Sequence, residues 1–86
     1  MNKPSNLHLA EIRELARRFN SEQIEACIQS TLESGHNPCF EDGDTEEVMN
    51  VLAKAEFVKS QMEQGMPLPE AIRELGRRIR AAQGNV

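Results

Sequence analysis

The stretch IRELARRF at residues 12–19 returns as IRELGRRI at residues 72–79, and this pair decides the fold. In each copy the apolar residues recur at intervals of three and four, which is the period of one helical face. Glu14 and Glu74 can each pair with arginines one turn further on. Beyond the two copies the chain differs, whereas a repeat architecture needs whole units to recur. We therefore interpret the likeness as two amphipathic helices that face one core.

Working outward from the first copy, we expect a helix over residues 7–19 with Ser5 or Asn6 as its N-cap. A second helix follows almost at once, with Ser21 as its cap. Gly35 is a typical left-handed helix stop.

The second half of the chain predicts two more helices. One begins at Asp44 or Thr45, ends at Gly65, and is apolar on more than one side, as a helix contacted from several directions is. The last begins near Pro69 and ends before Gly84. The predicted fold class is all-α: a compact four-helix single domain over residues 1–86, with a central third helix and with residues 1–6 and 84–86 frayed.

Gly76 lies inside the last helix, where glycine costs roughly 1 kcal/mol relative to alanine. Close approach of a neighbouring backbone is the simplest compensation. We therefore expect a tight helix contact at Gly76, and a similar one at Ala16, the matching residue of the first copy.

The length, net charge and cysteine content of the chain exclude several classes of function. At 86 residues the chain is one domain or less, and its net charge of −4 argues against a general affinity for nucleic acid or anionic membrane. No apolar run approaches the ~20 residues that a bilayer requires. Two cysteines are too few for a disulfide scaffold, which favours a reducing, cytoplasmic setting.

The strongest positive cluster is Arg73, Arg77, Arg78 and Arg80, and arginines of residues 13–18 extend it if the first and last helices are neighbours. This patch predicts contact with an acidic partner; the alternative is binding of nucleic acid or phosphate. Nucleic acid is disfavoured because no aromatic is interleaved for base stacking. A helix-turn-helix over residues 12–28 is disfavoured because its second helix has no lysine or arginine.

The segment GHNPCFEDGD, residues 35–44, is the long connection and a second predicted contact surface, with His36 and Cys39 as its candidate residues. Their spacing resembles half of a metal site that Cys27 and His8 could complete, but structural zinc normally needs two tight ligand pairs. Cys27 lies on an apolar stripe, where a free cysteine behaves as a small hydrophobe. Cys39 could be an accessible thiol, although neighbouring carboxylates disfavour its thiolate and hence a thiol sensor.

Two acid pairs, Glu22 with Glu25 and Asp44 with Glu47, resemble the magnesium-binding carboxylates of all-α nucleotide pyrophosphatases. The first acid of each pair also suits a helix start, where the dipole favours it. We therefore expect no cofactor, and a magnesium-dependent nucleotide hydrolase is a distant third function.

As a whole, the chain resembles a family of short bacterial helical proteins of unknown function. The resemblance implies an all-helical bacterial domain and no catalytic residue. By elimination the sequence predicts a non-enzymatic protein-interaction module. Its protein partner is unknown, and the chain could also associate with itself as a homodimer. The matching features are residues 12–19, Ser21, Ile24, Glu25, Gly43, Asp44, Glu47, residues 51–53, Met62, Glu63 and residues 71–73.

Overall fold

A computed structural model describes residues 8–83, and these residues form four α-helices and no strand. The helices are α1 (Leu9–Arg18), α2 (Ser21–Ser34), α3 (Thr45–Glu63) and α4 (Leu68–Gln83). The all-α, four-helix prediction is confirmed. The predicted fraying of residues 1–6 and 84–86 lies outside the described residues.

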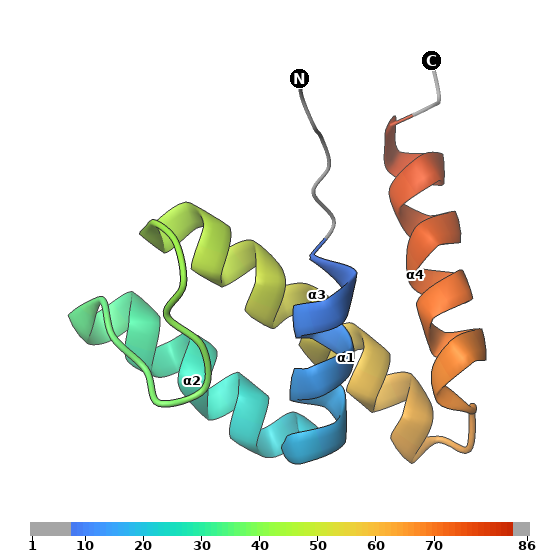
Figure 1. Cartoon of the computed structure of the whole chain (residues 1–86), viewed down its shortest axis with the longest axis horizontal. Helices are drawn as coiled ribbons and strands as arrows, with labels where there is room; N and C mark the ends of the chain where they lie inside the picture. The colour runs from blue at the N-terminus through green and yellow to red at the C-terminus, as the bar shows by residue number, and fades with distance from the viewer. Residues whose placement is uncertain (1–7, 84–86) are drawn as a thin grey trace.

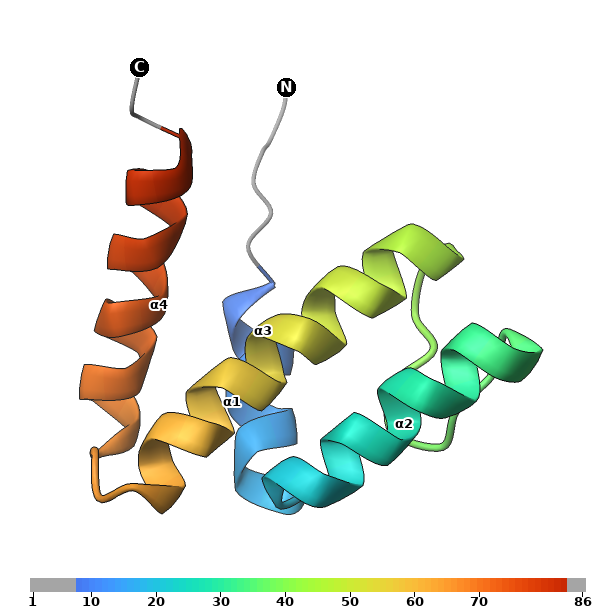
Figure 2. The ribbon, with the colours of Figure 1, turned by 180° about the vertical axis from the view of Figure 1, so that it is seen from behind.

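Helix α3 is the centre of the fold, because α1, α2 and α4 each pack against it. Helix α2 runs beside α3, α1 crosses it, and α4 stands at the opposite end of the molecule from α2, as both ribbon views show (Figures 1 and 2). Contact from three sides explains why α3 is apolar on more than one face. Its buried residues are Val48, Val51, Leu52, Ala55 and Val58.

The two similar segments both contribute to one aliphatic core. From α1, Ile12 and Ala16 are fully buried and Leu15 is nearly so. From α4, Ala71 and Leu75 join the same cluster. The remaining apolar positions of the two segments, Phe19, Ile72 and Ile79, are half-buried against it. The interpretation of the likeness as shared core-facing helices is confirmed.

The helix starts differ from prediction in two places. The N-cap of α2 is Asn20 rather than Ser21: its side chain accepts from the Gln23 N–H at 2.7 Å, while the Gln23 side chain accepts from the Asn20 N–H at 2.9 Å. This reciprocal pair is a capping box, which satisfies two backbone donors at once. The N-cap of α1 is His8 in a left-handed conformation, not Ser5 or Asn6.

The other predicted boundaries are confirmed. Gly35 ends α2 with a φ of 84°, a conformation that favours glycine. Asp44 caps α3 by accepting from the Glu47 N–H at 2.9 Å. Gly65 follows the end of α3 with a φ of 109°.

Ser21 has a tertiary role instead of the predicted capping role. Its backbone N–H and its hydroxyl donate to the two carboxylate oxygens of Glu63 at 2.9 and 2.6 Å. These hydrogen bonds, aided by Lys59, lower the pKa of Glu63. The carboxylate also lies at the positive end of the α2 dipole. The contact therefore ties the start of α2 to the end of α3.

The predicted backbone contact at Gly76 is wrong. A Cβ at this position would meet only the Arg80 Nη1 atom, at 3.6 Å, which is ordinary van der Waals contact. No neighbouring helix approaches, and Gly76 instead lines a surface hollow. Ala16, the matching residue of α1, is fully buried, and the tight helix contact expected there stays a prediction.

Candidate functional site

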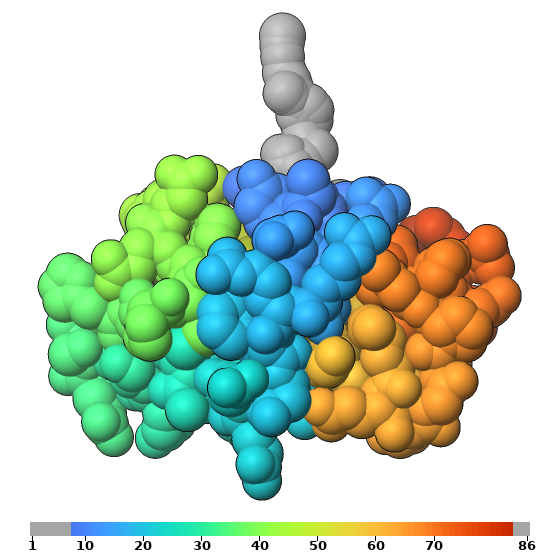
Figure 3. All heavy atoms as spheres, turned by 60° about the horizontal axis from the view of Figure 1, so that its bottom comes forward, coloured from blue at the N-terminus to red at the C-terminus, as the bar shows by residue number. Residues whose placement is uncertain are grey.

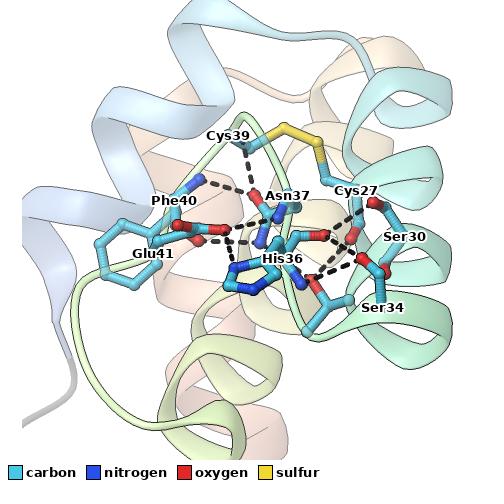
Figure 4. Close-up of polar contacts among 9 residues, drawn as sticks. Cys27, Ser30, Ser34, His36, Asn37, Cys39, Phe40 and Glu41 are labelled. Carbon is cyan, nitrogen blue, oxygen red and sulfur yellow. Dashed lines mark hydrogen bonds and ion pairs between the residues drawn. A yellow bond between two sulfur atoms is a disulfide. The ribbon is translucent and has the colours of Figure 1, made fainter.

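The loop between α2 and α3 is tied to α2 by a disulfide between Cys27 and Cys39, with an S–S distance of 2.10 Å and Cα atoms 6.2 Å apart (Figure 4). The expectations of a free Cys27 and an accessible Cys39 thiol are therefore wrong. A single disulfide is no scaffold, but here it fixes one loop. The inward position of Cys27 on α2 was the available signal, because it lies where a returning loop could reach it.

Asn37 organises the same loop, although the sequence analysis did not single it out. Its side chain is 8% exposed and makes four hydrogen bonds. The Nδ2 group donates to the Thr31 hydroxyl and the Phe40 carbonyl at 2.8 and 2.9 Å. The Oδ1 atom accepts from the N–H groups of Cys39 and Phe40 at 2.7 and 2.8 Å. A buried amide satisfied on both ends holds the loop in one conformation.

His36 lies outside this buried network. Its side chain is largely exposed, and its Nδ1 atom is 3.2 Å from Glu41 Oε2 (Figure 4). Because the sulfurs of Cys27 and Cys39 are bonded to each other, neither is available as a thiolate ligand or a thiol sensor. Within residues 8–83 no three histidine, cysteine or acidic side chains gather as metal ligands. A contact role for His36 and Cys39 stays a prediction.

The two acid pairs considered for magnesium lie at opposite ends of α3. Glu22 and Glu25 belong to the start of α2, which the Ser21–Glu63 contact holds beside the end of α3. Asp44 and Glu47 belong to the start of α3, about 28 Å away for a helix of this length. The structure does not bring the four carboxylates together.

The arginines predicted as a patch on α4 are mostly paired within their own helix. Arg73 contacts Glu70 at 3.0 Å, while Arg77 and Arg78 contact the two oxygens of Glu74 at 2.6 and 3.2 Å. The Arg78 guanidinium also lies over the Phe57 ring, 5.3 Å from its centre. Pairing reduces the charge that these three arginines offer to a ligand.

Arg80 differs from the other α4 arginines, because it makes no ion pair with any carboxylate of residues 8–83. It lies over Gly76 and borders a hollow of about 220 Å³ between α1, α3 and α4. Lys54 stands on the α3 side of this hollow. The floor is apolar and consists of Leu9, Ile72, Leu75 and Ile79.

A second hollow of about 360 Å³ adjoins the first, since both share Ile72 and Arg73. Arg13 and Arg17 of α1 line it opposite Leu68 and Pro69 of α4. Atoms of α1 and α4 border one another on the face where α1 is blue and α4 is orange (Figure 3). Arg13 and Arg17 of α1 thus line the same hollow as Arg73 of α4, whereas Arg18 does not; the extension of the positive patch onto α1 stays a prediction.

We name the two hollows together the α1–α4 groove. Of the ten lysines and arginines of the chain, five line it, and no carboxylate does so among the described residues. This is a local positive surface on a chain with a net charge of −4. An apolar floor with cations around it can hold an apolar side chain flanked by carboxylates. The five cations are Arg13, Arg17, Lys54, Arg73 and Arg80.

Comparison with known proteins gives no further guide to function, because no family model, curated protein or solved structure matches the chain. The resemblance to a bacterial helical family therefore stays a prediction. Among the helices of residues 8–83, none combines the length and apolar character needed to cross a bilayer.

Proposed function

We propose that this chain is a non-enzymatic protein-interaction module and that its α1–α4 groove binds an acidic segment of a protein partner. The observation that carries the proposal is the concentration of five cations around an apolar floor. Four of the five, Arg13, Arg17, Lys54 and Arg80, make no ion pair with a carboxylate of the described residues. Their charges remain available for an incoming carboxylate.

The composition of the groove favours a protein over a nucleic acid. Its floor offers Ile72, Leu75 and Ile79, which suit an aliphatic anchor and contribute by burying apolar area. No aromatic side chain lines it, so bases have no surface for stacking. The alternative function is binding of nucleic acid or phosphate through the α4 arginines, and three of those four arginines are already paired with Glu70 or Glu74.

The test uses two variants that remove the same number of charges. Lys54→Gln with Arg80→Gln empties the groove of its unpaired cations on α3 and α4. Arg77→Gln with Arg78→Gln is the matched control, since neither arginine lines the groove. Immobilised wild type and variants are incubated with extract of the native cells, and a captured protein is identified, purified and titrated by calorimetry.

We expect the groove variant to bind the purified partner about tenfold or more weakly, a change of at least about 1.4 kcal/mol, with the control unchanged. Equal affinity of wild type, groove variant and control for the partner would show that the groove is not the binding site. A short single-stranded RNA titrated in parallel tests the alternative. Salt-sensitive RNA binding that is lost with the α4 control variant would favour it instead.

A cytoplasmic location remains part of this proposal, and the Cys27–Cys39 bond is the observation that argues against it. Disulfides persist in oxidising compartments and are rare where glutathione keeps thiols reduced. Trapping the cysteines with an alkylating reagent in intact cells measures their redox state. Reduced cysteines in cells would support the cytoplasmic location, and a fully oxidised pair would contradict it.

A further inference from the structure

Helix α2 carries a surface whose chemistry is the reverse of the groove. Among residues 8–83, Leu32 is the one large hydrophobic side chain that stays mostly exposed, at 64%. Glu25 lies seven residues before Leu32, so it occupies the same helical face, and Glu33 adjoins it. All three are exposed, and α2 contains no lysine or arginine. We name Glu22, Glu25, Gln29, Leu32 and Glu33 the α2 strip.

The negative character of the α2 strip also affects the adjoining part of α3. Burial, followed by the charges of Glu25 and Glu63, raises the pKa of Glu56. Three carboxylates therefore gather where α2 lies against α3, and they repel one another. A cationic surface placed over them would relieve that repulsion.

The α2 strip and the α1–α4 groove match each other but cannot meet within one molecule. The groove has an apolar floor and cations around it, whereas the strip has one exposed leucine with Glu33 beside it and Glu25 two helical turns away. Helices α2 and α4 stand at opposite ends of the fold in both ribbon views (Figures 1 and 2). The two complementary surfaces are therefore available to different copies of the chain.

We infer that the chain associates head to tail with itself, the α2 strip of one copy seated in the α1–α4 groove of the next. Leu32 fills the apolar floor near Ile72 and Ile79, and the α2 glutamates face Lys54, Arg80 and the α1 arginines. This inference rests on the proposed function and names a second copy of this chain as the partner.

A contact of this kind joins two different surfaces, so each copy keeps one free groove and one free strip. Such a heterologous contact adds copies in series or closes a ring, whereas a two-fold dimer stops at two. The strip offers one exposed large apolar side chain, Leu32, and its other contacts are between charges at the surface. We therefore expect the association to depend on concentration and to weaken with salt.

The experiment is sedimentation of the intact chain at increasing concentration, at about 50 mM and about 500 mM salt. We expect the average mass of wild type to rise beyond a dimer at low salt and to fall at high salt. Leu32→Lys disables the strip, Lys54→Glu with Arg80→Glu disables the groove, and each alone should be monomeric. Leu32→Met keeps an apolar side chain and is the matched control that should associate as wild type does.

The decisive sample is an equimolar mixture of the strip variant and the groove variant. Each then has one working surface of the opposite kind, so the mixture should form a one-to-one dimer and no larger species. Glu25→Lys provides a second strip variant, and circular dichroism verifies that every variant is helical. A mixture that stays monomeric overturns the inference.

Two other results also overturn it: a wild type that is monomeric up to about 1 mM, which lies at the weak limit of specific association, or one that stops at a dimer. Neither of these two results contradicts the proposed function. That function fails only if the groove variant Lys54→Gln with Arg80→Gln binds the identified acidic partner as tightly as wild type.

Discussion

Loss of the Cys27–Cys39 bond should be the largest effect of any change outside the core. The bond closes a loop with a sequence separation of 12. Chain-entropy arguments assign about 3 kcal/mol to a loop of this size. A chain of 86 residues has a total unfolding free energy of about 4–13 kcal/mol. Reduction should therefore remove a large share of it and lower Tm by about 12–24 °C.

Cys39→Ala is the variant of choice, because Cys39 is half-buried and Cys27 can remain in the core as a small hydrophobe. The chain has no Trp and no Tyr, so unfolding is followed by far-ultraviolet circular dichroism of its helices rather than by fluorescence. Wild type and variant are melted with and without a phosphine reductant. The reductant should lower Tm of wild type to that of the variant and leave the variant unchanged.

A reduced wild type that melts within about 2 °C of the oxidised protein, equivalent to under about 0.5 kcal/mol, would refute this reasoning. The Asn37 hydrogen bonds would then hold residues 35–43 without the covalent link. The Asn37→Ala variant separates the two contributions, because it leaves the disulfide intact and removes the amide that orders the loop.

Four further predictions concern stability. Gly76→Ala should raise the unfolding free energy by roughly 0.5–1 kcal/mol in urea titrations, because the added Cβ meets only the Arg80 side chain, at ordinary van der Waals distance; destabilisation would show a contact that the fold does not display. Leu52→Ala removes a fully buried side chain of the central helix and should cost about 2.7–5 kcal/mol; a loss under about 1 kcal/mol would contradict a packed core at this residue. The pKa of Glu56 is raised by burial and by Glu25 and Glu63, so Glu56→Gln should raise Tm at neutral pH. That advantage should disappear as pH falls through the raised pKa, where wild type becomes protonated too; an advantage that persists in acid would not come from charge. Because the Ser21 hydrogen bonds lower the pKa of Glu63, Ser21→Ala should lower Tm above the ordinary carboxyl range. The difference from wild type should shrink as pH falls and Glu63 is protonated, and a constant difference would assign the effect to the helix start alone.

The sequence by itself determined the helices and which faces they bury. The three- and four-residue spacing around Ile12 and Ile72 places both segments on the core, and the wide apolar surface of residues 48–58 makes their helix central. Both results follow from periodicity, which is a property of neighbouring residues along the chain. The stop at Gly35 and the cap at Asp44 are local in the same sense.

Where two local signals compete, the sequence was a weaker guide. Asn20 and Ser21 are both good caps, and the presence of Gln23 three residues after Asn20 was the signal that favoured it. Once Asn20 caps the helix, Ser21 is free to bind Glu63, which is distant in sequence. The wrong prediction at Gly76 has a related reason. The free-energy cost of a glycine within a helix can be read from the local sequence, but packing decides whether a neighbouring helix or only the Arg80 side chain covers it.

Only the tertiary structure decided the features on which function depends. The disulfide required Cys39 to return to α2, and the groove required the separate cations Arg13, Lys54 and Arg80 to converge from three helices. Ion pairing within α4 likewise reduces the charge that Arg73, Arg77 and Arg78 offer to a ligand, and of these three only Arg73 lines the groove. Local periodicity determines which face of a helix is buried, whereas the distances between charges on different helices exist only after those faces have packed together.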